Sequence, residues 1–176
     1  MIKQADVVLA MFLLGDRFSQ EAKKRNFYFY DPLTTGDSSL SSCVEAIIAA
    51  QIGDMDKAFR YGMAALLMDL ADVGGNVKDG CHIASMGGTW MMLTYGFGGM
   101  RDTDGTLSFR PRRAPEENAI LRFPVTYRGH RLEVEIGLEK VQYALREGER
   151  LVIRHETEEI QLTREHPLAV RAVSRR

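Results

Sequence analysis

The sequence of 176 residues contains only two cysteines, five prolines and one tryptophan, and its formal net charge is −1. Two thiols, Cys43 and Cys81, are too few for a disulfide scaffold, so free buried thiols in a reducing compartment are expected. A charge near zero gives no electrostatic reason to bind nucleic acid or an anionic membrane. No apolar run reaches the roughly 18 residues that a transmembrane helix needs, and the first residues lack the layout of a signal peptide. These absences favour a cytoplasmic globular protein.

The composition changes near residue 101. All nine methionines and the tryptophan lie at or before residue 100. The 23 basic and 24 acidic residues divide into 20 in residues 1–101 and 27 in residues 102–176. An apolar segment is typical of tightly packed helices, whereas a short charge-dense segment is typical of an antiparallel sheet with one wet face. The sequence therefore predicts an α+β chain, with helices first and strands after.

Helical periodicity and end signals divide the first segment into five helices. We expect them at residues 5–14, 20–30, 42–52, 54–70 and 82–95. Ser42-Cys-Val-Glu45 has the pattern of a capping box at the start of the third helix. Gly53-Asp54 ends that helix and begins the next, so the two helices are expected to form an antiparallel hairpin.

Apolar residues at helical spacing mark the faces that are expected to be buried. They are Val44, Ile47, Ile48 and Ile52 in the third helix and Met55, Phe59, Met63, Leu66, Leu67 and Leu70 in the fourth. Trp90 is also expected in the core, and stacking on a sugar is the alternative for it.

Alternation of apolar and charged residues predicts strands in the second segment. One alternating run covers residues 121–127, and Arg128-Gly-His-Arg131 then turns the chain into the next run, at residues 132–136. Further strands are expected around residues 141–145, 151–153 and 160–162. Turn signals every 8–12 residues favour an antiparallel meander or a small sandwich, and Pro124 places its strand at a sheet edge.

The stretch Asp79-Gly-Cys-His-Ile-Ala-Ser-Met-Gly-Gly-Thr-Trp90 concentrates the candidate chemistry. His82 and Ser85 share one face at the start of a helix, where free N–H groups and the helix dipole suit an anion. Gly87 and Gly88 allow a ligand or a second backbone to come close. The structural alternative is helix packing at the two glycines and a helix cap at Ser85.

Two further segments are weaker candidates for binding. Lys3 and Gln4 open an otherwise apolar helix, where they are either ordinary surface residues or polar groups aimed into a cavity. Residues 37–42 are rich in hydroxyls, which suit either a loop with a cap or the lining of a sugar site. Asp69, Asp72 and Asp79 do not lie at metal-ligand spacing, and no His/Cys cluster indicates zinc, so no metal is expected.

These pieces, in this order, resemble glycoside hydrolase family 65, which comprises maltose, trehalose, kojibiose and related disaccharide phosphorylases and some trehalose hydrolases. The motifs that carry the resemblance are Lys3-Gln-Ala-Asp-Val-Val8, Leu14-Gly-Asp-Arg17, Tyr30-Asp-Pro-Leu-Thr-Thr-Gly-Asp-Ser-Ser-Leu-Ser41, Gly75-Asn76, Asp79-Gly80, His82-Ile-Ala-Ser85, Gly88-Thr-Trp90 and Gly96-Phe-Gly-Gly-Met100. The similarity is dense across residues 3–101 and looser across the strand segment.

The resemblance implies an architecture. Members of the family are several times longer than this chain and contain an (α/α)6 barrel followed by a small β domain. By that comparison, residues 1–101 are the last helices of the barrel and residues 102–176 are the C-terminal antiparallel β domain. The chain is then expected to be a C-terminal piece of such an enzyme, whose partner is the remainder of the barrel or a second chain. A homo-oligomer is also compatible with it.

The resemblance also implies a mechanism. In inverting phosphorolysis, a carboxylic acid protonates the leaving oxygen and phosphate attacks the anomeric carbon from the opposite face, in place of the water of an inverting hydrolase. His82, Ser85 and the backbone at Gly87 and Gly88 would then hold phosphate, and Lys3 and Gln4 would hold the sugar. The family's general-acid glutamate lies upstream of this region. The chain is therefore expected to contain no catalytic residue, to be inactive alone, and to need no cofactor besides phosphate as co-substrate.

One departure leaves the substrate open. Gly36 stands where several members similar to maltose phosphorylases have histidine, so the α-linked glucose disaccharide is not specified. Two alternatives to a phosphorylase also remain at this point: a non-catalytic sugar-binding or complex-forming module, and part of a trehalase-like hydrolase of the same family.

Overall fold

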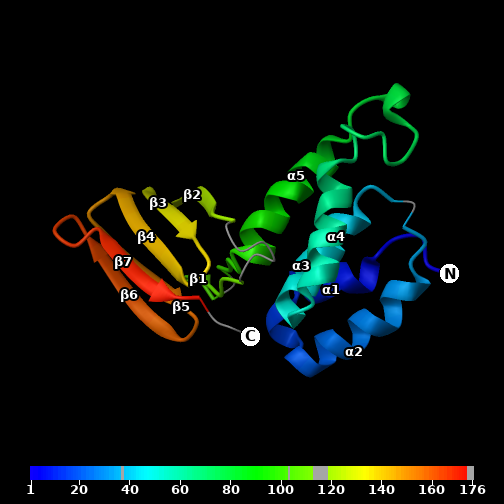
Figure 1. Ribbon diagram of the computed structural model, residues 1–176. Helices are drawn as coiled ribbons and strands as arrows, with labels where there is room; N and C mark the ends of the chain where they lie inside the picture. The colour runs from blue at the N-terminus through cyan, green and yellow to red at the C-terminus, as the bar shows by residue number, and fades with distance from the viewer. Residues whose placement is uncertain (37, 103, 113–118, 174–176) are drawn as a thin grey trace. The chain divides into compact units, whose positions relative to one another are not determined.

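The computed structural model of the chain describes residues 1–36, 38–102, 104–112 and 119–173. The chain forms two compact units, Met1–Gly96 and Phe97–Arg176. The first is helical and the second is built of strands, as Figure 1 shows. This order of a helical part followed by a small β part agrees with the fold class predicted from the sequence.

The described part of the helical unit contains five α-helices, and the longest connection is the one between the fourth and the fifth. They are α1 (Asp6–Leu13), α2 (Gln20–Tyr30), α3 (Ser41–Ile52), α4 (Met55–Leu66) and α5 (Ile83–Met91). Short 3-10 turns cover Gly15–Arg17, Asp31–Leu33 and Val77–Asp79, and a π-helix, Met92–Phe97, continues α5. The fourth helix is shorter than expected, because the chain leaves helical geometry after Leu66. The fifth is shorter too, because its last turns widen to π-helical geometry.

Helix α3 is the central helix of the unit. Residues 43–50 are all buried, so its apolar surface is wider than the predicted stripe. The predicted capping box at residues 42–45 is wrong, because the helix begins at Ser41 without a side-chain cap. The Ser41 hydroxyl instead accepts a hydrogen bond from the main-chain N–H of Ala5 at 3.2 Å. The serine that precedes the expected cap therefore joins the starts of two helices.

Helix α4 packs through small residues, and the predicted apolar stripe is wrong at several positions. Its buried residues are Ala58, Gly62 and Ala65. Phe59, Leu66 and Leu70 are exposed, at 40%, 47% and 82%. Because small side chains let helices approach closely, the small-residue face meets the core, and the three exposed side chains lie outside it. Met55, Met63 and Leu67 of the expected stripe are half-buried.

The turn between α3 and α4 follows the sequence signals. Gly53 adopts the left-handed conformation that ends α3, with φ at 85°, and Asp54 caps α4. The two helices then run back along each other as the predicted hairpin (Figure 1).

Replacing Asp54 with alanine is expected to lower the unfolding free energy of the helical unit by about 1–2 kcal/mol, measured by chemical denaturation. Its Oδ1 accepts from the main-chain N–H of Lys57 at 3.1 Å, and its Oδ2 accepts from the Tyr28 hydroxyl at 2.7 Å. Asp54→Asn retains a capping oxygen and should lose less unfolding free energy. Tyr28→Phe removes only the hydrogen bond from the Tyr28 hydroxyl and so measures its share of the loss. Equal stability of Asp54→Ala and the unaltered chain would contradict this role of the cap.

The environments of Trp90 and of the two cysteines differ in part from those predicted. Trp90 is 47% exposed, so its predicted place in the core is wrong. Cys43 and Cys81 are both free, as predicted, but only Cys43 is buried in a helix. Cys81 is exposed and precedes α5, because the helix begins two residues later than Cys81.

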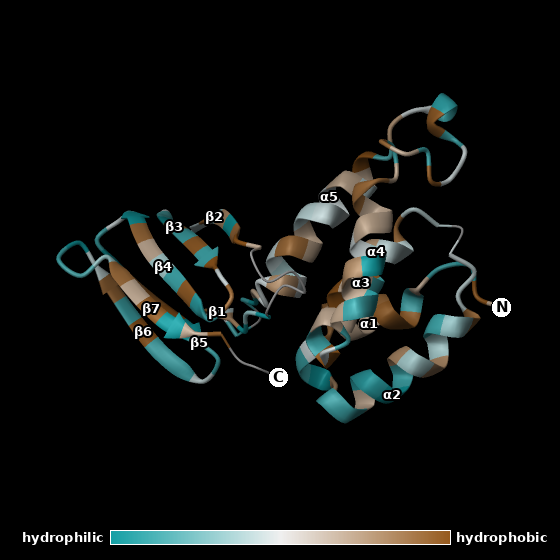
Figure 2. Cartoon of the chain, viewed as in Figure 1, coloured by the Kyte–Doolittle hydropathy of each residue, from teal (hydrophilic) through white to brown (hydrophobic). Residues whose placement is uncertain are grey.

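The β unit contains two sheets. Its strands are β1 (Leu107–Phe109), β2 (Leu121–Tyr127), β3 (His130–Ile136), β4 (Lys140–Glu147), β5 (Arg150–His155), β6 (Glu158–Thr163) and β7 (Leu168–Ala172). One sheet has the order β2-β3-β4-β7 and is antiparallel, and the other has the order β1-β5-β6. Figure 2 shows apolar and polar residues alternating along these strands. Buried side chains of both sheets, among them Phe109, Phe123 and Tyr143, form one core.

Two details of the β unit bear on the sequence predictions. Strand β2 is an edge strand, as Pro124 indicated, since a proline cannot donate a ladder hydrogen bond. The sheets are not wholly antiparallel, because β1 pairs in parallel with β5. The turn between β2 and β3 is limited to Arg128 and Gly129, both with positive φ, and His130 already belongs to β3.

Candidate functional site

The predicted site residues lie near the starts of α1, α3 and α5. These three helices run in the same general direction (Figure 1), since each is separated from the next by a helix that returns. The chain before α1 is fixed beside the loop before α3. The Ile2 N–H donates to the Leu33 carbonyl at 2.8 Å, and the Thr35 N–H donates to the Ile2 carbonyl at 2.9 Å. The segments predicted to bind sugar are therefore neighbours at one end of the helical unit.

Lys3 and Gln4 lie directly after this pairing, and both are exposed. The Lys3 carbonyl accepts from the Thr35 hydroxyl at 3.5 Å, which holds the main chain while the side chains stay accessible. Gly36, the position of the departure from the family pattern, has φ at 75°. Asp37, part of the hydroxyl-rich loop, lies outside the described residues.

His82 immediately precedes α5 and forms a pair with Asp69. The Asp69 Oδ1 lies 2.6 Å from His82 Nδ1, and Oδ2 accepts from the His82 main-chain N–H at 2.8 Å. The hydrogen bonds with the His82 side chain and, less strongly, with its main-chain N–H hold the pKa of Asp69 below its usual range. Both side chains are largely shielded, with 19% of His82 and 13% of Asp69 exposed. The carboxylate is therefore ionised near neutral pH and close enough to orient the imidazole.

Ser85 is buried, at 1% exposure, and its hydroxyl donates to the Ala65 carbonyl of α4 at 3.3 Å. The main-chain N–H groups of Ser85 and Met86 both donate to the His82 carbonyl, at 2.9 and 3.2 Å. Several donors at the start of α5 are thus already used within the chain. The predicted contact of Ser85 with phosphate competes with its bond to Ala65 and stays a prediction.

The two glycines of α5 differ in their surroundings. At Gly87, an added β-carbon would meet no atom within 4 Å. At Gly88, it would lie 2.7 Å from Cβ of Cys43 and closer still to its Sγ. Gly88 therefore has the packing role that the sequence left as an alternative, and Gly87 borders open space. Their assignment to phosphate stays a prediction.

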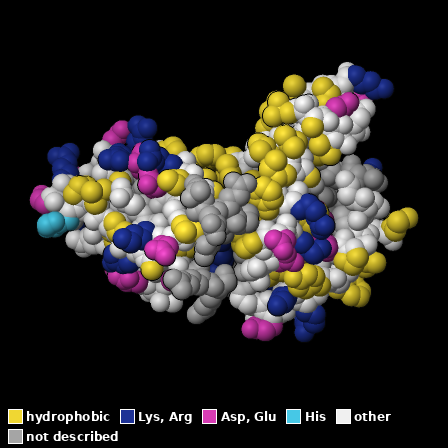
Figure 3. Space-filling model, viewed as in Figure 1, with side chains coloured by type: hydrophobic (Ala, Val, Ile, Leu, Met, Phe, Trp, Pro, Cys, Tyr) yellow, Lys and Arg dark blue, Asp and Glu magenta, His cyan; other side chains and the backbone are white. Residues whose placement is uncertain are grey.

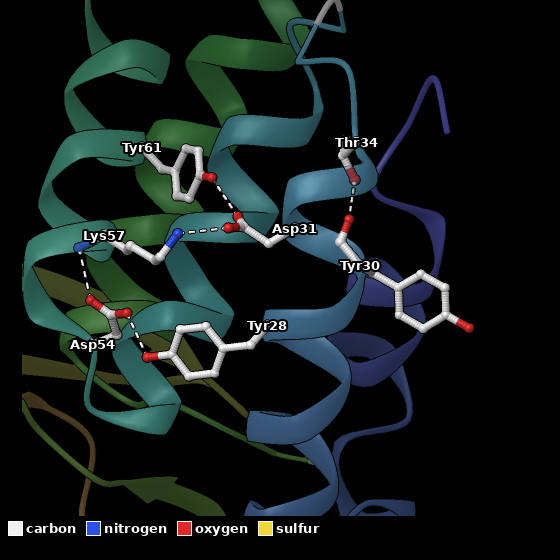
Figure 4. Close-up of polar contacts among 7 residues, drawn as sticks. All are labelled: Tyr28, Tyr30, Asp31, Thr34, Asp54, Lys57 and Tyr61. Atoms are coloured by element: carbon white, nitrogen blue, oxygen red, sulfur yellow. Dashed lines mark hydrogen bonds and ion pairs between the residues drawn. The ribbon is translucent and has the colours of Figure 1, made fainter. Parts of the chain in front are cut away.

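A second polar cluster, unnoticed in the sequence, joins α2, α3 and α4. Asp31 accepts from Lys57 Nζ at 2.6 Å and from the Tyr61 hydroxyl (Figure 4). Glu45 is only 3% exposed, and burial together with the charge of Asp31 raises its pKa to about 7, while Lys57 opposes the shift. Burial and the bond to Asp31 also raise the pKa of Tyr61. The spacing of carboxylates along one helix could not have predicted this cluster, because its members come from different segments of the chain.

Exposed apolar side chains gather on α4, α5 and the turn between them. They are Leu66, Leu70, Val73, Ile83, Met86 and Trp90. Figure 3 shows hydrophobic side chains collected on this side of the helical unit. A contiguous apolar area of this kind is typical of a surface that meets another protein surface.

Comparison with known proteins identifies the family. The sequence model of the glycosyl hydrolase family 65 central catalytic domain matches residues 1–91, and that of the family's C-terminal domain matches residues 100–162. The chain belongs to glycosyl hydrolase family 65. The resemblance read from the motifs is thereby confirmed.

Several relatives in family 65 carry the names of disaccharide phosphorylases. The chain is 47% identical to an alpha,alpha-trehalose phosphorylase of Thermoanaerobacter brockii over 86% of its length, and 42% identical to that of Geobacillus stearothermophilus over 96%. A solved structure assigned as a kojibiose phosphorylase from the human microbiome matches 97% of the chain with a TM-score of 0.88 and 30% identity. The chain spans 19%, 22% and 23% of these proteins, or about a fifth of their length.

No group of three or more His, Cys, Asp or Glu side chains among the described residues could hold a metal ion. None of the described helices is long and apolar enough to cross a membrane.

Proposed function

We propose that this chain supplies the phosphate side and part of the sugar side of the active site of an inverting disaccharide phosphorylase. The enzyme would convert an α-glucosidic disaccharide and phosphate into β-glucose 1-phosphate and glucose. The names of the relatives support the class of enzyme. The observation that carries the assignment within this chain is the imidazole of His82, held by Asp69 at the start of α5. Maltose, trehalose and kojibiose phosphorylases all occur among the relatives, so the disaccharide stays open.

The residues would divide the work as follows. His82 would contact a phosphate oxygen, with Ser85, Gly87 and Gly88 beside it in the first turns of α5. Lys3 and Gln4 would hold the sugar. Phosphate would attack the anomeric carbon while the bond from that carbon to the leaving oxygen breaks, and a carboxylic acid from outside this chain would protonate that oxygen. Phosphate is then a co-substrate, and no cofactor takes part.

The exposed apolar residues on α4 and α5 would contact the rest of the catalytic domain. The chain spans about a fifth of its relatives, and the central-domain match accounts for its helical unit. Burying exposed apolar side chains stabilises an assembled domain, at roughly 25 cal/mol for each Å² removed from water. The upstream part would come from the same polypeptide or from a partner chain, and the assembled enzyme would be cytoplasmic.

Replacing His82 with alanine is expected to raise the Michaelis constant for phosphate about tenfold or more, because a charge-assisted hydrogen bond is lost. The constant for the disaccharide should change much less. The measurement uses this chain in place of the segment that it matches in the Geobacillus stearothermophilus trehalose phosphorylase. Initial rates are then followed against phosphate and trehalose separately.

Two controls accompany this measurement. His166→Ala removes an exposed histidine of the β unit and should leave both constants unchanged. The 176-residue chain alone should give no turnover. Equal effects of His82→Ala on phosphate and sugar would reject the phosphate assignment. Trehalose hydrolysis that is independent of phosphate would favour a family hydrolase instead, and turnover by the chain alone would contradict the absence of its general acid.

A further inference from the structure

We propose that Asp69 is the positioning residue of the phosphate site: it holds His82 with Nδ1 protonated and directed to the carboxylate, so that Nε2 is the atom offered to phosphate. The inference rests on the proposed function for the identity of the ligand. The orientation of the ring rests only on contacts within the chain.

Asp69 makes two contacts with His82, one with its main chain and one with its side chain. One carboxylate oxygen accepts from the main-chain N–H at 2.8 Å and the other lies 2.6 Å from Nδ1. An ionised carboxylate only accepts hydrogen bonds, so Nδ1 must carry the proton at this contact. The main-chain bond fixes where the residue stands, and the side-chain bond fixes how its ring is turned. A single contact would leave one of these free.

The remaining nitrogen is left for a ligand. Within the described part of the chain, the hydrogen bonds of His82 use its N–H, its carbonyl and Nδ1. Nε2 lies across the ring from Nδ1 and is directed away from Asp69. A neutral His82 would accept a hydrogen bond from a phosphate hydroxyl at Nε2, and a protonated His82 would donate a hydrogen bond from Nε2 to a phosphate oxygen. Both arrangements contain the same number of protons and make the same contact.

A second bond fixes the helix that carries His82. The hydroxyl of buried Ser85 donates to the Ala65 carbonyl, and Ala65 precedes Asp69 by four residues. His82 and Ser85 are three residues apart at the start of α5. Two bonds about one helical turn apart therefore join the start of α5 to the end of α4 and to the turn that follows α4. Ser85 sets the position of the helix, and Asp69 sets the orientation of the imidazole.

The test follows the histidine nitrogens by nitrogen-15 NMR in the 176-residue chain. We expect the Nδ1–H form at His82, and Asp69→Asn should convert it to the Nε2–H form, because an amide can donate to Nδ1. Asp69→Glu retains the carboxylate and should retain the Nδ1–H form. Asp72→Asn makes the same change of charge in the same segment and should alter nothing at His82. His155, whose Nδ1 lies 2.8 Å from the Tyr143 hydroxyl, is an internal reference in the β unit.

Inorganic phosphate is then titrated into each variant. Phosphate should shift the His82 Nε2 resonance, and Asp69→Asn should weaken the apparent affinity about tenfold, the loss of one oriented charge-assisted contact. Asp69→Glu should recover most of that affinity.

The outcomes separate the two proposals. An unchanged His82 tautomer in Asp69→Asn, or an Nε2–H form in the unaltered chain, overturns the positioning role whatever phosphate does. A switched tautomer without any shift of His82 by phosphate supports the positioning role and contradicts the phosphate assignment. Since the tautomer of the unaltered chain is itself decisive, the inference does not depend on the folding of a variant.

Discussion

Replacing Glu45 with glutamine is expected to remove a fall of about 3 kcal/mol in unfolding free energy between pH 4.5 and pH 7. Glu45 lies on the central helix α3 and is only 3% exposed. Its pKa is raised from 4.5 to about 7, first by burial and then by the charge of Asp31, while Lys57 acts in the opposite direction. The cluster contains two carboxyl groups for one ammonium, so its charge balances only while Glu45 is protonated.

The sign follows from proton binding. Between pH 4.5 and pH 7, folded Glu45 retains a proton that the unfolded chain has lost, so the folded state binds more protons. The stability that this proton provides is complete below pH 4.5 and is lost as the pH rises to about 7. Glu45→Gln keeps the size and neutrality of the protonated side chain. The unfolding free energy of the variant should therefore rise relative to that of the unaltered chain as the pH rises.

The measurement compares urea unfolding of the two proteins at several pH values from 4 to 8. The difference between them is the informative quantity, because burial lowers the pKa of His155, which gives the opposite slope in the β unit. Glu149→Gln is a matched control, because its side chain is 75% exposed. A difference between Glu45→Gln and the unaltered chain that does not change with pH would show that Glu45 titrates at its ordinary value.

Replacing Gly88 with alanine is expected to lower the unfolding free energy by about 2 kcal/mol, although alanine favours helices. The added β-carbon would fall 2.7 Å from Cβ of Cys43 and closer to Sγ, on a helix that is buried on most sides. The contact cannot be relieved by turning a flexible side-chain end, so α5 and α3 must separate. Thermal and urea unfolding both report the loss.

Gly87→Ala is the matched control for this change, and the opposite sign is expected. Gly87 is the preceding residue of the same helix, and its β-carbon would enter open space. Removing a glycine from a helix interior should stabilise the unit by about 0.5–1 kcal/mol. Cys43→Gly should recover part of the loss in Gly88→Ala, because it removes both clashing atoms. Similar effects of Gly87→Ala and Gly88→Ala would contradict the packing role of Gly88.

The boundary between α3 and α4 could be predicted because its signals are local. Gly53 takes positive φ, and Asp54 caps α4 by accepting from the main-chain N–H of Lys57, three residues later. Strands β2 to β6 were predicted, because one face of each meets the shared core, whereas β1 and β7 were not predicted. Each of these features depends on residues only a few positions apart.

The surface of the helices could not be predicted in the same way. Phe59, Leu70 and Trp90 are apolar at helical spacing, yet this chain leaves them exposed. Periodicity shows which side chains share a face, and it does not show what covers that face. Ser42 had a suitable partner three residues later, but α3 began one residue earlier, at Ser41.

Some residues of the candidate site could likewise be predicted from local signals, and others could not. His82 could be singled out because it stands at the start of a helix. Lys3 was singled out because it was expected to open one, but α1 begins three residues later, at Asp6. Asp69 and Glu45 could not be singled out, since their importance comes from partners on other segments, 13 residues away for Asp69 and its His82. The charge and spacing of residues along one helix do not predict contacts between residues on different segments.

The π-helix after α5 acts as a correction of helical phase. Gly88 faces Cys43, and eight residues later Gly96 faces Ile47, with its added β-carbon 3.4 Å from the Ile47 Cα. In an unbroken α-helix, eight residues turn about 80° beyond two full rotations, so the two glycines would face different directions. The wider turns from Met92 to Phe97 hold more residues per rotation and cancel much of this drift. If the same eight residues were wound as an unbroken α-helix, Gly96 would turn about 80° away from α3.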